Sequence, residues 1–71
     1  MTLRQAKEGN EYTVVSVKTE DSEVDAFLFS LGCYAGERIK LVSKRKSGCI
    51  IYIKNGRYSI DSLLSDAIEI E

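Results

Sequence analysis

The segment CIIYIKNGRYSI, residues 49–60, constrains the fold of this chain more than any other part of it. In its first half every second side chain from Cys49 to Ile53 falls on the same face, which is typical of a β-strand with one buried side. The pair Asn55-Gly56 separates this run from a second one, RYSI. Asn-Gly between two strand-like runs favours a type I′ turn, because both central residues need a positive φ. The sequence therefore predicts an antiparallel β-hairpin.

Three further runs have the composition of strands. YTVVSVK at 12–18 is rich in β-branched residues, RIKLVSK at 38–44 places Ile39 and Leu41 on one face, and IEIE at 68–71 alternates as well. Several short strands joined by tight turns suggest a mainly β fold, a small SH3-like barrel in which closing of the sheet removes exposed strand edges. A chain of 71 residues has the length of one domain, so we expect residues 1–71 to fold as a single unit.

The segment SEVDAFLFSLG predicts a short amphipathic helix over about residues 22–31, inserted between strands, with Ser22 as its cap. Its apolar residues follow the i, i+3, i+4, i+7 spacing of a buried stripe, which consists of Val24, Phe27, Leu28 and Leu31. Phe29 points about 140° away from Val24 at 3.6 residues per turn. An aromatic side chain there is either an ordinary exposed residue or an anchor for a partner.

Two glycines, Gly32 and Gly36, lie between this helix and the next predicted strand. A phosphate-binding loop needs a strand before it, a helix after it and a lysine, whereas here the order is reversed and the lysine is missing. The spacing GxxxG pairs helices only within an apolar membrane helix, which is missing as well. We interpret both glycines structurally. Gly32 ends the helix in the left-handed conformation, and Gly36 turns the chain into the following strand.

Residues for catalysis and for metal binding are scarce. The chain has no histidine, which removes most hydrolase triads, most zinc sites and the usual general base. Cys33 and Cys49 have no base or ligand set at suitable spacing, so we expect two buried, unreactive free thiols. The sequence predicts no catalytic residue, no metal site and no cofactor. A weaker hypothesis is a metal-bridged dimer that senses iron through Cys33 and carboxylates.

Charge is unevenly distributed along the chain, although the net charge is only −1. Residues 38–60 contain seven basic side chains and no acidic one, interleaved with Tyr52 and Tyr58. Such a block is typical of a solvated sheet face, but an alternative function, that of a small nucleic-acid-binding barrel, would also use it. The pI of about 5.4 argues against that alternative. The basic face could also meet an acidic protein or anionic lipid head groups.

The start of the chain, MTLRQAKEGNEY, lacks the basic and apolar regions of a signal peptide. No apolar run in the sequence is long enough to span a membrane. We therefore expect a cytoplasmic protein that is not itself membrane-spanning, although it can be recruited to the inner face of the membrane by a partner.

The run LFSLGCYAGERI, residues 28–39, resembles the L-x-x-L-G-x-x-x-G-x-x-[IV] signature of the FeoA family. The matching positions are Leu28, Leu31, Gly32, Gly36 and Ile39. Ala35 stands where the family often has proline, and Ala26-Phe27 stand where it often has arginines. The resemblance covers essentially the whole chain and implies an SH3-like barrel with a helical insertion.

The resemblance also implies a function. Members of this family are small cytoplasmic accessory proteins of bacterial ferrous-iron transport, which assist or regulate the membrane transporter FeoB and its GTPase domain without catalysing a reaction. We expect the helix and the loop after it to contact this partner through Phe29, Cys33 and Tyr34, with Lys44, Arg45 and Lys46 as a basic adjunct. A homo-oligomer is a further expectation that the sequence leaves open.

Overall fold

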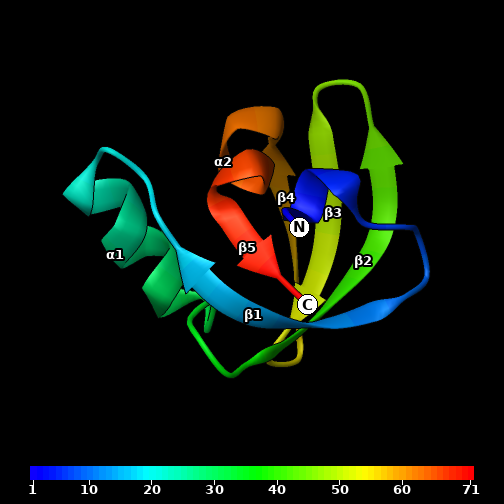
Figure 1. The fold of residues 1–71 in the computed structure, drawn as a ribbon, viewed down its shortest axis with the longest axis horizontal. Coiled ribbons are helices and arrows are strands. Elements are labelled where there is room, and N and C mark those ends of the chain that lie inside the picture. Colours follow the sequence, from blue (N-terminus) through cyan, green and yellow to red (C-terminus); the bar gives the residue numbers. More distant parts are fainter.

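The computed structural model describes all 71 residues and contains five strands and two short helices (Figure 1). A turn of 3₁₀ helix, η1, precedes them. The elements follow in the order η1 (Leu3–Gln5), β1 (Glu11–Val17), α1 (Ser22–Ser30), β2 (Arg38–Arg45), β3 (Gly48–Ile53), β4 (Gly56–Asp61), α2 (Ser62–Ala67) and β5 (Ile68–Ile70). All neighbouring strands are antiparallel, and the sheet has the order β4-β3-β2-β1-β5. The predicted mainly β fold is confirmed.

Alternation along β2 and β3 builds the core. Ile39 and Leu41 of β2 are fully buried while Arg38 and Lys40 are exposed, as the period-two pattern predicts. On β3 the same holds for the inward row from Cys49 to Ile53. Ile68 and Ile70 of β5 and Val14 of β1 complete the opposite wall of the core. A register slip of one residue would expose every one of these side chains, so the apolar pattern fixes the pairing.

The β3–β4 turn differs from the predicted one by one residue. Its central pair is Lys54-Asn55, with φ values of 50° and 65°, and not Asn55-Gly56. The two positive φ values keep the type I′ character of the turn. Gly56 instead pairs with Ile53, and a Cβ on it would lie 2.5 Å from the Tyr58 hydroxyl oxygen. Gly56 is therefore needed as space for the Tyr58 ring, and Lys54 accepts the left-handed conformation.

The residue that caps helix α1 is one position earlier than predicted. The N-cap is Asp21, whose carboxylate accepts a hydrogen bond of 2.9 Å from the Glu23 amide, so Ser22 lies inside the helix. Asp25 of the first turn accepts hydrogen bonds from the amide and the hydroxyl of Thr19, at 3.2 and 2.6 Å. These bonds satisfy donors at the helix start and fix the chain that enters it.

The predicted apolar stripe of α1 is only partly buried. Leu28 is fully buried, Val24 and Leu31 are half-buried, and Phe27 is 53 % exposed. The assignment of Phe27 to the buried stripe was therefore wrong. Figure 1 shows the reason: α1 lies to one side of the sheet and projects from it. A helix in that position meets the body along a strip too narrow to cover the Phe27 side of the helix.

The end of α1 confirms the interpretation of Gly32. Its φ is 95°, its amide donates to the Phe29 carbonyl, and the Cys33 amide donates to the Leu28 carbonyl, each at 3.0 Å. These two bonds form a Schellman motif with Gly32 at its left-handed position. Gly36, with φ 94°, lies two residues before β2 and turns the chain into it, as predicted.

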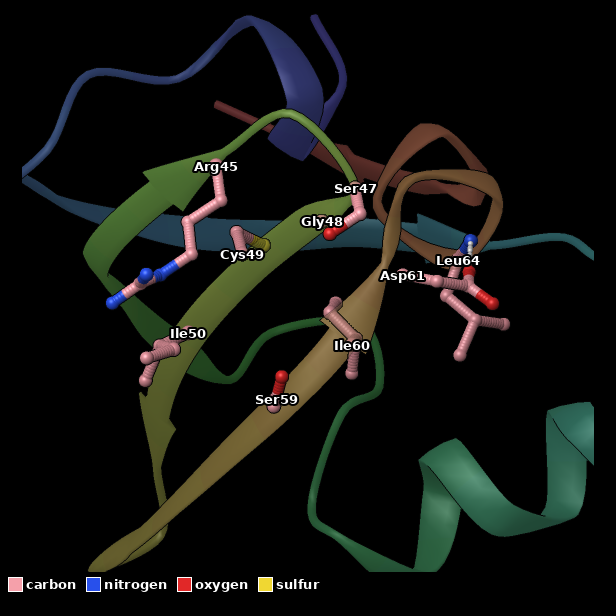
Figure 2. A pocket seen from close by; sticks show the side chains of 9 residues that line it. All are labelled: Arg45, Ser47, Gly48, Cys49, Ile50, Ser59, Ile60, Asp61 and Leu64. Carbon is pink, nitrogen blue, oxygen red and sulfur yellow. Dashed lines mark hydrogen bonds between the residues drawn. The ribbon is translucent and has the colours of Figure 1, made fainter.

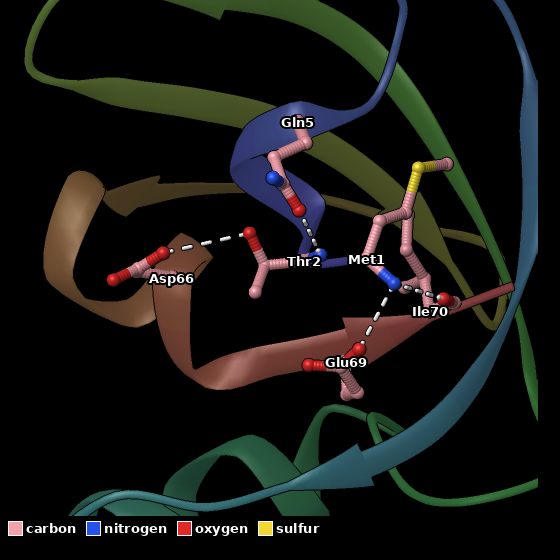
Figure 3. A network of polar contacts seen from close by, with 6 residues as sticks. All are labelled: Met1, Thr2, Gln5, Asp66, Glu69 and Ile70. Carbon is pink, nitrogen blue, oxygen red and sulfur yellow. Dashed lines mark hydrogen bonds and ion pairs between the residues drawn. The ribbon is translucent and has the colours of Figure 1, made fainter.

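The two edge strands of the sheet, β4 and β5, do not pair with each other, and α2 connects them. The outer side of β5 is covered by the start of the chain (Figure 3). The Met1 ammonium group donates to the Glu69 carboxylate at 2.9 Å and to the Ile70 carbonyl at 3.3 Å, and Thr2 forms a bridge with Glu69. The start of the chain is thus bound where an unprotected edge would invite association. None of the helices is long and apolar enough to cross a bilayer.

Candidate partner-binding surface

An aromatic pair lies on the outer side of the α1–β2 connection. Phe29 of α1 is 64 % exposed, and its ring stacks on that of Tyr34 with centroids 4.8 Å apart and planes tilted by 33°. The Schellman motif at Gly32 reverses the chain after the helix, which is why two residues five positions apart can stack. Such offset pairs are favourable and hold each ring in a defined orientation. The exposure predicted for Phe29 is confirmed.

Lys54, from the distant β3–β4 turn, completes this surface. Its ammonium group lies 5.5 Å from the centroid of the Tyr34 ring and 2.7 Å from the Glu37 carboxylate. The hydrogen bond with Lys54 lowers the pKa of Glu37, and the same bond, followed by one with Tyr34, raises the pKa of Lys54. Both groups therefore stay charged across the neutral range. We call Phe29, Tyr34, Lys54 and Glu37 the aromatic surface.

Gly32 permits this arrangement because its hydrogen atom faces the lysine. A Cβ on Gly32 would lie 2.4 Å from Cγ of Lys54. The aliphatic part of the Lys54 side chain can therefore pack on the end of α1 only because residue 32 is glycine. Sequence reasoning missed Lys54 and Glu37 because no local pattern links residue 54 to residues 32–37. The only signal in the sequence was Gly32, because a glycine can mark a place where another part of the chain packs closely on the backbone.

Cys33 does not lie in an exposed loop, contrary to the prediction that it contacts a partner. It is 2 % exposed, and burial raises the pKa of its thiol to about 11. It occupies the position of the Schellman motif that packs back onto the helix, and it joins Leu28 in the core cluster. The expectation of buried thiols is correct for both cysteines, since Cys49 is also free and buried, with its sulfur 3.2 Å from the Ser65 hydroxyl oxygen.

Ligands for a metal do not converge in this fold. No three Cys, Asp or Glu side chains form a group that could hold an ion. Cys33 faces the core as a protonated thiol, whereas metal ligation requires a thiolate at an accessible position. The geometry therefore offers no support for the hypothesis of a metal-bridged dimer through Cys33.

The structure does not place the predicted basic adjunct beside the aromatic pair. Lys44, Arg45 and Lys46 lie at the β2–β3 turn, whereas Lys54 follows the other end of β3. Six strand residues separate the two ends by about 18 Å. The Lys44 ammonium group donates to the Ala6 carbonyl at 3.2 Å, and the three side chains form no ion pair. They are exposed cations on a separate part of the surface.

A shallow pocket of about 470 Å³ adjoins this basic turn (Figure 2). It lies over β3 and β4, with Arg45 on one side and Asp61 on the other. Gly48 is required at its floor, because a Cβ there would lie 2.0 Å from the Ile60 carbonyl oxygen. No aromatic side chain lines the pocket, so it lacks a stacking platform for a base or a nucleotide.

The basic block 38–60 is divided by the fold. Arg38 pairs with Glu11 at 2.6 Å, and Lys54 pairs with Glu37, so two of its cations are compensated. The register places Lys40 opposite Tyr52, and Tyr52 opposite Arg57, in one exposed row across three strands. Tyr52 is 42 % exposed in the centre of that row. This row is the part of the block that retains the features of a nucleic-acid-binding face.

Comparisons with known proteins agree with this architecture. The family model of the FeoA domain matches residues 1–71. A search of curated protein sequences gives no significant match. Among solved structures, an iron uptake regulatory protein, FeoA, aligns over 100 % of this chain and 95 % of its own, with 21 % identity and a TM-score of 0.89.

Two further structures share the fold. Stenotrophomonas maltophilia FeoA, a prokaryotic SH3 domain protein complexed with zinc, aligns over 100 % of this chain and 89 % of its own, at 18 % identity and a TM-score of 0.88. A manganese-dependent transcriptional repressor aligns over 99 % of this chain but only 40 % of its own, at 18 % identity and a TM-score of 0.88. The TM-scores show a common SH3-like fold. The family model, which spans the whole sequence, establishes that this chain belongs to the FeoA family.

Proposed function

We propose that this protein is a non-enzymatic accessory and regulatory protein of ferrous-iron uptake, which binds the cytoplasmic part of a FeoB-type membrane transporter. Family membership supports the link to iron transport, and the S. maltophilia relative is described as a possible ferrous iron transport activating factor. The observation that carries the binding role is the exposed Phe29 ring stacked on Tyr34. A cytoplasmic location with recruitment to the inner membrane face follows from this proposal.

The aromatic surface has the properties of a binding anchor. Phe29 offers a large apolar area to a partner, and the stack on Tyr34 holds its ring in one orientation before binding. A pre-oriented side chain loses little conformational entropy when a partner covers it. Lys54 and Glu37 supply charges of both signs at the rim, where they favour one orientation of the partner. Aromatic residues in such settings carry much of the binding energy in interfaces.

The scarcity of catalytic groups supports the non-enzymatic part of the proposal. The chain has no histidine, and its two thiols are buried with raised pKa values. A nucleophilic cysteine needs a thiolate stabilised by a nearby positive charge or base. Burial in an apolar core, as found for Cys33 and Cys49, favours the protonated thiol instead. The residues of this chain are therefore suited to contact and not to bond cleavage.

The test is a binding titration with the purified cytoplasmic GTPase domain of the transporter, in the nucleotide-free, GDP-bound and GTP-analogue-bound states. Phe29→Ala should weaken binding at least about tenfold, which corresponds to about 1.4 kcal/mol. Phe27→Ala is the matched control, because it removes an exposed phenylalanine of the same helix outside the aromatic surface. Reversal of the three charges at Lys44, Arg45 and Lys46 tests the basic adjunct. Absence of wild-type binding in every nucleotide state would contradict the proposal.

A second candidate function rests on the row of Lys40, Tyr52 and Arg57. Lys40 and Arg57 form no ion pair, although Glu11 lies opposite Lys40 at the end of this row. The tyrosine between them can stack on a base while the cations contact phosphates. This function requires binding of single-stranded RNA or DNA that falls steeply with salt and is lost in Tyr52→Ala. Filter binding at low salt measures it, and no retention of either nucleic acid would remove the candidate.

A further inference from the structure

A groove of about 590 Å³ separates α1 from α2. Its apolar lining comes from both helices, with Val24 on α1 and Leu63, Leu64 and Ala67 on α2. It is a different surface from the one proposed to bind the transporter, because Val24 and Phe29 point about 140° apart around α1. Figure 1 shows α1 and α2 as separate helices, and Figure 2 shows Leu64 on the side of α2 that faces α1.

Leu63 is the least covered apolar side chain of the groove. It is 81 % exposed, the largest value among the large hydrophobic residues, while Val24 and Leu64 are half-buried. The two helices do not cover each other, because α1 packs on the rest of the protein mainly through Leu28, which lies on the helix face adjoining the one that lines the groove. An apolar groove of two helices with an open leucine is the usual geometry for a segment that adds its own apolar side chains.

The rim of this groove is strongly acidic. Glu20, Asp61 and Asp66 line it, and Lys18 is the single cation among the lining residues. Asp21, the cap of α1, follows Glu20 directly in the chain and carries a further carboxylate. None of these acids takes part in an ion pair, since the three ion pairs of the protein use Glu11, Glu37 and Glu69. Lys18 offsets only part of the charge of the three lining carboxylates, so the groove keeps a negative potential.

Two of the lining carboxylates are held by hydrogen bonds. Asp61 accepts one of 2.9 Å from the Leu64 amide and caps α2, and Asp66 accepts one of 3.5 Å from the Thr2 hydroxyl. Their geometry is set by the fold before any partner arrives. A rim of fixed negative charge around an apolar floor selects a ligand that carries cations on either side of an apolar stripe.

We propose that the α1–α2 groove binds a basic amphipathic segment of a partner protein, whose apolar side chains contact Leu63 and Val24 and whose Lys or Arg residues face the acidic rim. A second copy of this chain fits less well. Its basic β2–β3 turn, KRKS at 44–47, has the right charge but no apolar side chain for the floor. This proposal does not depend on the transporter as partner, nor on the aromatic surface.

The test uses a synthetic amphipathic peptide of about 14 residues, built from Leu and Lys with helical spacing, and a matched peptide with Glu in place of Lys. Amide shifts of the labelled protein report where each peptide binds. We expect saturable binding of the Lys peptide, with shifts at residues 18–25 and 61–67, and no binding of the Glu peptide. Shifts confined to another surface would overturn the proposal.

Two variants separate the groove from general attraction between charges. Leu63→Ser should weaken binding of the Lys peptide at least about fivefold, because the anchor contact is lost while the fold keeps its buried core. Asp66→Asn combined with Glu20→Gln should weaken binding and flatten its salt dependence. Phe29→Ala is the control and should bind the peptide as wild type does. Equal affinity of Leu63→Ser and wild type would show that the groove is not the site.

Self-association is measured in the same samples without peptide. Sedimentation should show a concentration-independent monomer mass if a partner segment is the occupant. A dimer that is lost in Leu63→Ser would mean that a second copy fills the groove, and this result would overturn the proposal in favour of a homodimer. Failure of the peptide test with intact transporter binding would leave the proposed function unaffected.

Discussion

The two helices of this protein differ in how they are attached. Helix α2 packs against η1, β3, β4 and β5, and the hydroxyl of its buried Ser65 donates to the Asp61 carbonyl at 2.9 Å. Helix α1 is longer, but Leu28 is its only buried side chain. The short helix therefore bridges the gap between the edge strands, whereas the longer one is held at its end by Leu28 and the Schellman motif.

This difference teaches where the fold can carry function. Helix α2 contacts four elements, yet it leaves Leu63 81 % exposed, so it too separates packing residues from residues that a partner can reach. A helix attached along one strip leaves its outer side free, and α1 presents Phe29 there at 64 % exposure, whereas Val24 is half-buried against the core. Within the nine residues of α1, the residue that attaches the helix to the core, Leu28, is next to the residue exposed to a partner, Phe29. Substitutions at single positions can therefore separate these two roles.

The largest effect is expected where α1 meets the core. Leu28→Ala removes a fully buried side chain and leaves a cavity, which should lower the free energy of unfolding by about 3 kcal/mol. Leu63→Ala on α2, at 81 % exposure, should change it by less than about 0.5 kcal/mol. Urea denaturation measures both. Equal losses in the two variants would contradict the assignment of Leu28 as the residue that attaches α1 and of Leu63 as an exposed residue of α2.

The Schellman motif gives the next largest effect. Gly32→Ala places a Cβ at positive φ and against Lys54, so we expect a loss of about 2 kcal/mol and displacement of the lysine from Glu37. Gly36→Ala meets no atom within 4 Å and should lose only the backbone contribution, about 1 kcal/mol. Urea denaturation of the two variants measures the difference. A smaller loss in Gly32→Ala than in Gly36→Ala would mean that Lys54 does not cross the helix end.

The two helices also differ in a nearby cysteine whose protonation makes the stability depend on pH. Cys33 follows α1, and Cys49 contacts Ser65 of α2. Burial raises the pKa of Cys33 from 9.0 to about 11, so the folded state keeps a proton that the unfolded state loses. Stability from this group is complete below about pH 9 and is lost as the pH rises toward 11. By pH 10 the loss is about 1.4 kcal/mol.

The difference in unfolding free energy between wild type and Cys33→Val, measured from neutral pH to about pH 10, isolates this contribution. The valine variant should lack the cysteine part of the decline. In Cys49 the hydrogen bond with Ser65 and the charge of Lys44 oppose the effect of burial on the pKa, so Cys49→Val should alter the decline less. Parallel pH curves for wild type and Cys33→Val would show that Cys33 is accessible to water.

The smallest effect on stability is expected on the exposed face of α1. Phe29→Ala removes the stack on Tyr34 and should cost about 0.5 to 1 kcal/mol, while Phe27→Ala should be nearly neutral. Thermal unfolding of the two variants measures this difference. A large loss from Phe29→Ala would mean that this ring has a role in packing, and it would weaken its assignment as a partner contact.

Much of the sheet can be predicted from the sequence, because its signals are local. The alternation in β2 and β3 follows from period-two burial, and the left-handed end of α1 follows from Gly32 after the last apolar residue. The exposure of Phe29 follows from helical geometry alone. In each case a residue and its near neighbours contain the whole physical reason.

The predictions are wrong where the environment of a residue depends on elements that are distant in the sequence. Phe27 has the spacing of a buried residue, but whether it is buried depends on how much of α1 the sheet covers. Cys33 follows the helix in a short loop between two glycines, and only the direction of the Schellman motif places it in the core. The β3–β4 turn shifts to Lys54-Asn55 because Gly56 must lie under Tyr58. The aromatic surface itself joins residues that are far apart in the sequence, and no local pattern contains that contact.

We propose that the transporter binds to the Phe29 face of α1. The most direct measurement is a map of amide shifts in the labelled protein on addition of the transporter's cytoplasmic domain. We predict shifts concentrated at residues 29–37 and at Lys54, with little change at Lys44, Arg45 and Lys46. Shifts confined to the β2–β3 turn, with residues 29–37 unperturbed, would contradict the claim.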